Sequence, residues 1–160
     1  MTIVRAVTLQ ETLGLKEAPS NGMAWHTLLQ KGLPFRSFAS TAKAIGQTEN
    51  SFANLIAITP QTLAARKKAR RLNAVESDLV YAIARAFVKL AGARGMTGAA
   101  AWLTSPALEL KQAIPVQLAR TRLGTEYVMG AIERERTALI AKQKHQSNTK
   151  GTQDKDEEEY

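Results

Sequence analysis

The chain has 160 residues, no cysteine, 44% hydrophobic and 6% aromatic residues, and a formal net charge of +8. This length fits one domain or two small ones, and the lack of cysteine excludes disulfides and thiolate metal sites. The positive charge indicates a polyanionic partner. Because the composition is poor in aromatic residues and rich in alanine, we expect an all-α fold.

The charge is unevenly distributed along the chain. Residues 1–150 carry 21 Lys/Arg and 9 Asp/Glu, whereas residues 151–160 carry one lysine and five carboxylates. No apolar run approaches the ~20 residues that a membrane span needs, and the N-terminal residues lack the apolar region of a secretion signal. We therefore expect a cytoplasmic protein with a basic body, no membrane contact and a short acidic tail.

The first half of the chain reads as a series of short helices with clear start and stop residues. Residues 1–22 have mixed polarity and predict a flexible N-terminal arm. A short helix over residues 23–31 ends at a glycine. Capping residues or prolines predict further helices that begin at Pro34, Thr48, Thr59 and Asn73. Residues 23–92 are thus expected to form one helical domain.

A glycine-rich stretch from Gly92 to Gly95 predicts a boundary between two helical parts. Beyond it, we expect a small helical domain over residues 96–143. Its helices are expected to begin at Thr97, Pro115 and Thr125. Residues 144–160 are polar and end in an acidic run, which predicts a disordered acidic tail.

The segment Thr48 to Arg71 has the pattern of a helix-turn-helix, which needs two short helices and a tight turn. Ala53 is the small residue of the first helix, residues 57–59 form the turn, and Leu63 is the inward residue of the second helix. At about 100° per residue, the face opposite Leu63 would enter the major groove. The second helix ends in five cations between residues 66 and 71. The expected DNA-binding residues are Thr59, Gln61, Ala64, Ala65, Lys67, Lys68, Arg70 and Arg71.

A simpler interpretation of the same cations is a solvated helix end, because the helix dipole alone favours cations there. Two residues also need an explanation. Ala57 occupies a turn position where glycine is usual, so the turn must avoid a positive φ or tolerate it. Arg66 falls on the side of Leu63, so its head must find a carboxylate or water.

Two series of motifs resemble the Xre/MbcA/ParS-like antitoxins, which partner RES-domain toxins. The first half contains Gly32-Leu33-Pro34, then Thr62-Leu63-x-x-Arg66, Leu72 and Glu76-Ser77. The second half contains Ala99-x-x-Trp102-Leu103, Pro106, Pro115, Leu118-x-x-Thr121, Gly124 and Val128. The resemblance covers about residues 28–133, and it depends on the order and spacing of these elements.

This resemblance implies a helix-turn-helix that binds operator DNA and represses its own operon, followed by a toxin-binding domain that occludes an NAD-consuming toxin. It implies no catalytic residue and no cofactor, and we expect a homodimer. On the helix expected from Thr125, the charged residues proposed to face the toxin are Glu126, Glu133, Arg134 and Arg136. The acidic tail either enters the cationic entrance of the toxin or only solubilises the chain. Trp102 is expected to be structural.

The residues give little support to an enzyme. His26 and His145 lack metal-binding spacing, and no serine has a nearby histidine that could act as a base. We therefore expect no catalytic site and no metal site. The main alternative is a stand-alone helix-turn-helix regulator whose C-terminal half dimerises or senses a ligand. An RNA-binding module is a further class, but no set of stacking aromatic residues lies among the cations.

Overall fold

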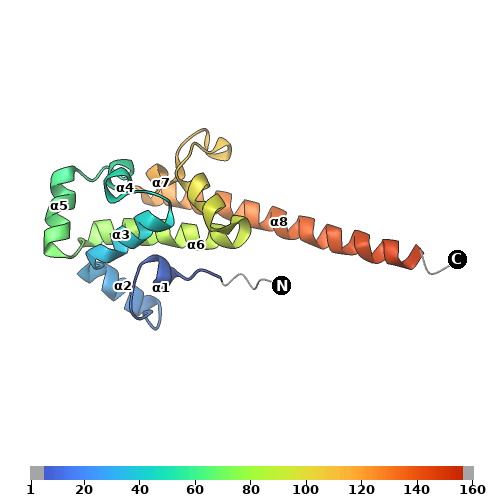
Figure 1. Ribbon diagram of the computed structural model, residues 1–160, viewed down its shortest axis with the longest axis horizontal. Coiled ribbons are helices and arrows are strands. Elements are labelled where there is room, and N and C mark those ends of the chain that lie inside the picture. Colours follow the sequence, from blue (N-terminus) through green and yellow to red (C-terminus); the bar gives the residue numbers. More distant parts are fainter. Residues whose placement is uncertain (1–5, 157–160) are drawn as a thin grey trace.

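The computed structural model describes the backbone of residues 6–156 and the side chains of residues 6–148. Within this range the chain is all-α, as expected, with isolated β-bridges and no strand (Figure 1). The helices are α1 (Leu9–Thr12), α2 (Gly22–Lys31), α3 (Phe35–Ala44), α4 (Glu49–Leu55), α5 (Pro60–Ala69), α6 (Ala74–Leu103), the 3-10 helix η1 (Leu108–Leu110), α7 (Pro115–Leu118) and α8 (Arg122–Asp156).

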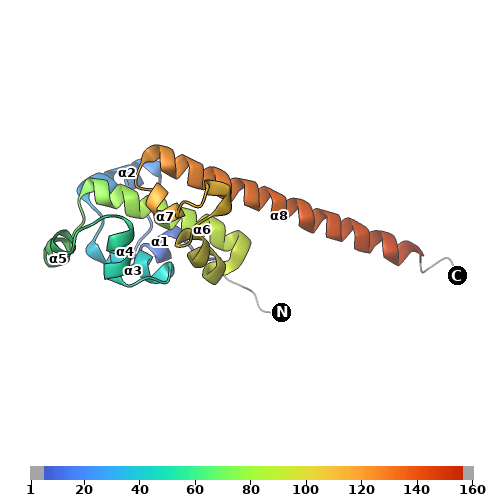
Figure 2. The same cartoon turned by 90° about the horizontal axis from the view of Figure 1, so that it is seen from above.

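Helix α6 is the central element, and it contacts α1, α2, α3, α7 and α8. Helices α4 and α5 follow from α3, and α5 lies at one end of the molecule. The distal part of α8 extends from the opposite end, as both views agree (Figures 1 and 2). The structure therefore has two protruding ends on one helical body.

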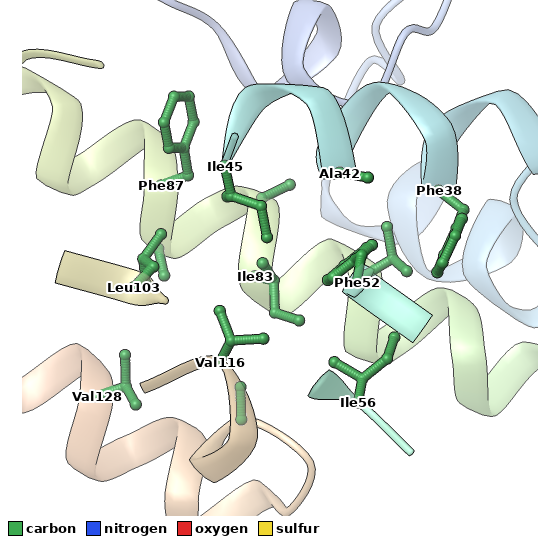
Figure 3. Packing of buried hydrophobic residues seen from close by; sticks show 14 of the residues in the cluster. Phe38, Ala42, Ile45, Phe52, Ile56, Ile83, Phe87, Leu103, Val116 and Val128 are labelled. Carbon is green, nitrogen blue, oxygen red and sulfur yellow. The ribbon is translucent and has the colours of Figure 1, made fainter. Parts of the chain in front are cut away.

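A single hydrophobic cluster joins the two halves of the chain. Phe38 of α3 stacks on Phe52 of α4 with ring centroids 4.7 Å apart. The same cluster contains Ile83 of α6, Val116 of α7 and Val128 of α8 (Figure 3). Because α6 contributes to the core along most of its length, the body that carries α5 and the base of α8 pack as one unit.

The expected helix starts at Thr48, Thr59 and Asn73 are confirmed. Each of these side chains accepts a hydrogen bond from a backbone N–H three residues later. Asn73 forms a full capping box, because the Glu76 side chain also accepts from the Asn73 N–H at 3.0 Å. Local side-chain hydrogen bonds thus set these helix starts.

The N-terminal arm is not loose over its whole length, which corrects the expectation for residues 1–22. Helix α1 begins after a Thr8 cap, and Leu13 is fully buried in the core. Thr41 of α3 donates a hydrogen bond to the Thr12 carbonyl oxygen at 3.5 Å. Packing on α3 and α6 holds this segment. Because this packing joins residues far apart in the sequence, it leaves no periodic pattern in the segment from which a helix could be predicted.

The chain leaves the helical conformation at Gly95, where φ is 80° and ψ is 167°, and a helix resumes after it and runs to Leu103. This break lies in the glycine-rich stretch where a boundary is expected, two residues before the expected helix start at Thr97. The expected start at Thr125 is wrong. Helix α8 begins at Arg122, because the Thr121 hydroxyl accepts the Gly124 N–H at 2.9 Å and takes the capping role. The start at Pro115 is confirmed by α7.

Residues expected to be disordered from Lys144 continue α8 as a helix to Asp156, while residues 157–160 lie outside the described residues. Residues 141–148 of this segment are exposed. Lysine and glutamine are good helix formers, so the segment extends the helix that precedes it although its side chains up to residue 148 are exposed.

Trp102 is a core residue, as expected. Its side chain is buried, and its Nε1–H donates to Glu109 Oε1 of η1 at 2.8 Å. A backbone hydrogen bond at Glu109, followed by this indole N–H, lowers the pKa of the Glu109 carboxyl below its usual value. The indole thus fixes the η1 loop beside the end of α6.

Candidate nucleic-acid interface

Helices α4 and α5 form two short helices joined by a tight turn. Ile58 donates its N–H to the Ala53 carbonyl oxygen at 2.8 Å, which closes the end of α4. Ala57 adopts a φ of 57°, so the turn tolerates the left-handed conformation that is expected for a glycine. For a residue with a Cβ, this conformation costs about 1–2 kcal/mol.

The inward face of this pair is the expected one. Leu63 of α5 and Ala53 of α4 are 7% and 3% exposed. Ala53 is small enough for α5 to approach α4 closely, and Leu63 fills the space between them. The packing therefore fixes the rotation of α5 about its own axis.

On the outer side of α5, the structure brings together the exposed residues Gln61, Ala64, Ala65 and Lys68. Thr59 is exposed at the start of the helix, and its hydroxyl accepts the Thr62 N–H at 3.2 Å. Thr59 therefore acts first as the cap of α5. The exposed face contains two polar side chains and two methyl groups, which suits contacts to base edges.

Backbone hydrogen bonds anchor the far end of α5 to the segment before α3. Phe35 donates its N–H to the Arg70 carbonyl oxygen at 3.0 Å, and Leu72 donates to that of Leu33 at 2.9 Å. Gly32 allows this close approach, because a Cβ there would lie 2.1 Å from the Leu72 carbonyl oxygen. Ser77 Oγ accepts the buried Leu33 N–H at 2.7 Å. Both ends of α5 are thus held rigidly.

Arg66 forms an ion pair with a carboxylate, as expected from its inward position. Its Nε lies 2.7 Å from Glu76 Oε1, and this carboxylate is 11% exposed. Since Glu76 also closes the capping box of α6, one carboxylate ties α5 to the central helix α6.

The other cations at the end of α5 differ in their ion-pair and hydrogen-bond partners. Lys67 Nζ lies 3.3 Å from Glu49 Oε2 of α4, and Arg71 Nη1 donates to the Lys31 carbonyl oxygen at 3.3 Å. Arg36 of α3 lines the same shallow hollow as Lys67 and Arg70. The sequence did not single out Arg36 or Glu49, because only the folded Phe35–Arg70 contact brings α3 beside α5.

One family model matches this part of the chain. Residues 24–85 match the antitoxin Xre-like helix-turn-helix domain. This domain is followed by further helices, and it is typical of DNA-binding antitoxins and regulators. The match ends at Arg85, so it includes α2 to α5 and the first part of α6 but not α7 or α8. No curated protein matches the chain.

The four charged residues expected to face a toxin all lie on α8. Glu133 Oε1 lies 3.4 Å from Lys89 Nζ of α6 and 3.0 Å from Arg136 Nη1, so these two residues share a network that joins α8 to α6. Glu126 lies 3.8 Å from Arg122, and Arg134 is exposed. Arg94 and Glu135 form a further ion pair between the two helices. Part of this charge therefore holds α8 in place.

A metal site and a membrane span are two further possibilities for a helical chain. The described side chains contain no group of three or more His, Cys, Asp or Glu residues that could hold a metal ion. In the described part of the chain, no helix is long and apolar enough to span a bilayer.

Proposed function

We propose that this protein is the antitoxin of a type II toxin–antitoxin pair, that it acts in the cytoplasm, and that it binds operator DNA through α5 to repress its own operon. The observation that carries the proposal is the match of residues 24–85 to an antitoxin helix-turn-helix domain, together with the exposed outer face of α5. A homodimer would present two such helices to two half-sites.

The proposed DNA contacts divide into two kinds. Gln61 suits adenine, Lys68 suits guanine, and the methyl groups of Ala64 and Ala65 suit thymine. Lys67, Arg70 and Arg71 lie toward phosphates, with Thr59 at the start of the helix. Arg36 adds a phosphate contact from α3, because it shares a hollow with Lys67 and Arg70.

We further propose that residues 96–143 bind and occlude a RES-domain toxin that consumes NAD. The support is the series of motifs from Ala99 to Val128 and the position of α8 at the end opposite α5. Several motif residues are buried, including Trp102 and Val128, which leaves the outward charged residues of α8 for the partner. These are Glu126, Glu133, Arg134 and Arg136.

The test is co-expression of the full chain with the product of the adjacent gene, followed by affinity capture and a gel shift with the upstream DNA. We expect a RES-domain protein to co-purify without NAD-consuming activity, and the complex to shift the DNA. The double variant Arg70→Glu/Arg71→Glu should lose the DNA shift and keep the toxin. DNA binding without a toxin partner would instead establish a stand-alone regulator.

A further inference from the structure

A groove of about 480 Å³ lies between the first half of α6 and the start of α8. Its floor is partly apolar and includes the half-buried side chains of Leu79 and Met129. Val75, which is 79% exposed, lies at its edge. An exposed apolar floor of this kind fits a docking segment that brings an apolar side chain.

Three arginines line the same groove: Arg85, Arg120 and Arg122. Among the described residues, neither Arg85 nor Arg120 has a carboxylate within ion-pair distance, and Arg122 is paired only at 3.8 Å with its side chain 96% exposed. Two carboxylates, Asp78 and Glu126, also line the groove. The groove therefore carries an excess of cations and attracts a segment with several carboxylates.

One face of α8 leads from this groove along the exposed helix. Residues spaced alternately by four and three positions share a helix face, and from Arg122 they continue through Met129 to Ile140. Ile140 is 50% exposed, and residues 141–148 beyond it are polar or small. This face offers a track for a second helix that ends in the groove. Glu126, Glu133 and Arg136 lie on the same face, so a second copy and the proposed toxin would compete for it.

We propose that the groove of one copy receives the acidic segment 154–160 of a second copy of this chain, and that the exchange is reciprocal. The segment reads DKDEEEY. Its run Glu157 to Glu159 supplies carboxylates for the three arginines. Tyr160 supplies an aromatic ring for the apolar floor, with a hydroxyl that can remain in water.

The length of α8 keeps the segment away from the groove of its own chain. Thr125 lines the groove, and α8 continues from it to Asp156. At 1.5 Å per residue, these 31 steps place Asp156 about 46 Å from Thr125. Residues 157–160 span at most about 14 Å when extended. They cannot reach the groove of their own chain while α8 remains helical.

Reciprocal exchange also gives a closed dimer. When two α8 helices run antiparallel and each segment reaches the groove of the other copy, the two-fold axis passes near the midpoint between residues 125 and 156. That midpoint is at residue 140, so the exposed Ile140 of one copy meets that of the other. A two-fold arrangement uses the same surface on both copies and leaves no open end.

The experiment is analytical ultracentrifugation of the full chain over a range from about 1 to 100 µM. We expect a mass twice the 17.4 kDa of one chain, with weaker association at higher salt. The groove variant Arg120→Glu/Arg122→Glu should weaken dimerisation at least tenfold. The segment variant Glu157→Lys/Glu158→Lys/Glu159→Lys should weaken it to a similar extent. Circular dichroism should show that both variants remain helical.

The decisive measurement uses an equimolar mixture of the groove variant and the segment variant. Each variant alone places like charges together, whereas in the mixture both contacts again join opposite charges, so a heterodimer should form. The control Lys16→Glu/Lys111→Glu makes an equal change of charge at two exposed residues away from the groove, and it should dimerise like the wild type.

Several outcomes would overturn the proposal. A monomeric wild type at 100 µM would show that the segment does not bind a second copy. A wild-type dimer that both charge reversals leave intact would place the interface elsewhere. A mixture that stays monomeric, or a mass that keeps rising with concentration, would exclude reciprocal exchange.

Discussion

The two ends of the molecule are helices that differ in how they are held. Helix α5 has ten residues, and hydrogen bonds from neighbouring segments fix both of its ends. Helix α8 has 35 residues, and among its described side chains the buried ones lie in its first part, at residues such as Val128 and Ile132. Helix α5 is held by hydrogen bonds at its ends, whereas residues 141–148 of α8, which lie beyond the body, are exposed.

This difference fits two kinds of recognition. Reading base edges requires side chains held in a fixed position, which the clamped α5 provides. A partner protein can instead be met by a long helix face that presents charge over a large surface. Helix α5 lies at one end of the molecule, and the distal part of α8 extends from the other (Figures 1 and 2).

The largest expected effect is on the inward face of α5. Leu63→Asp places an unpaired charge against α4 and should lower the free energy of unfolding by more than about 3 kcal/mol. Chemical denaturation followed by circular dichroism measures this. The matched control is Ala64→Asp on the exposed side, which should remain folded. A Leu63→Asp chain as stable as this control would show that the inward face is misassigned.

The second-largest expected effect on stability is at the ion pair between Arg66 of α5 and Glu76 of α6. Arg66→Ala leaves the Glu76 carboxylate, which is 11% exposed, without its cation, and we expect a loss of about 1–3 kcal/mol in the free energy of unfolding. Lys67→Ala breaks the more exposed pair with Glu49 and should cost about 0–1 kcal/mol. Equal losses in urea titrations of the two variants would contradict the special role of Arg66.

The cations at the end of α5 should affect all DNA sequences alike. Arg70→Ala/Arg71→Ala should weaken binding to specific and unrelated duplexes by the same factor. It should also reduce the slope of log K against log salt by about 0.9 for each phosphate that the protein no longer neutralises. Fluorescence anisotropy at several salt concentrations measures both. An unchanged slope would remove these residues from the DNA interface.

The smallest effect should be at the turn. Ala57→Gly relieves a positive φ but adds freedom to the unfolded chain, so we expect a gain of about 0–1 kcal/mol in the free energy of unfolding. Ala64→Gly, within α5, should instead lose about 0.5–1 kcal/mol. If thermal melts show both glycines to be equally destabilising, the left-handed conformation of Ala57 does not store strain.

The sequence predicted the α5 end far better than the α8 end, for a physical reason. Thr48, Thr59 and Asn73 cap helices through hydrogen bonds within three residues, so their signal is local. The inward position of Arg66 likewise implied a carboxylate, and Glu76 supplies it. These features depend on few residues that are close in sequence.

Features that depend on tertiary packing could not be predicted in this way. Leu13 is buried because α3 and α6 cover it, and Arg36 reaches the α5 surface through a contact between segments 35 residues apart. The helix breaks at Gly95, where the glycine-rich stretch indicated a boundary, but the sequence did not show that buried Ala99 and Leu103 pack the helix beyond the break into the same core. Either Thr121 or Thr125 could cap the start of α8, and the local sequence does not distinguish them. The structure shows that Thr121 does so.

The most direct test of the account is a comparison of DNA sequence preference between the wild type and the double variant Gln61→Ala/Lys68→Ala. Both proteins are titrated into the duplex upstream of the gene and into a scrambled duplex of equal length. We expect the wild type to prefer the upstream duplex. In the double variant each lost base contact should reduce this preference by about 1–3 kcal/mol, and binding to the scrambled duplex should weaken less than binding to the upstream duplex. Full sequence preference in the double variant would contradict the assignment of the outer face of α5 to DNA.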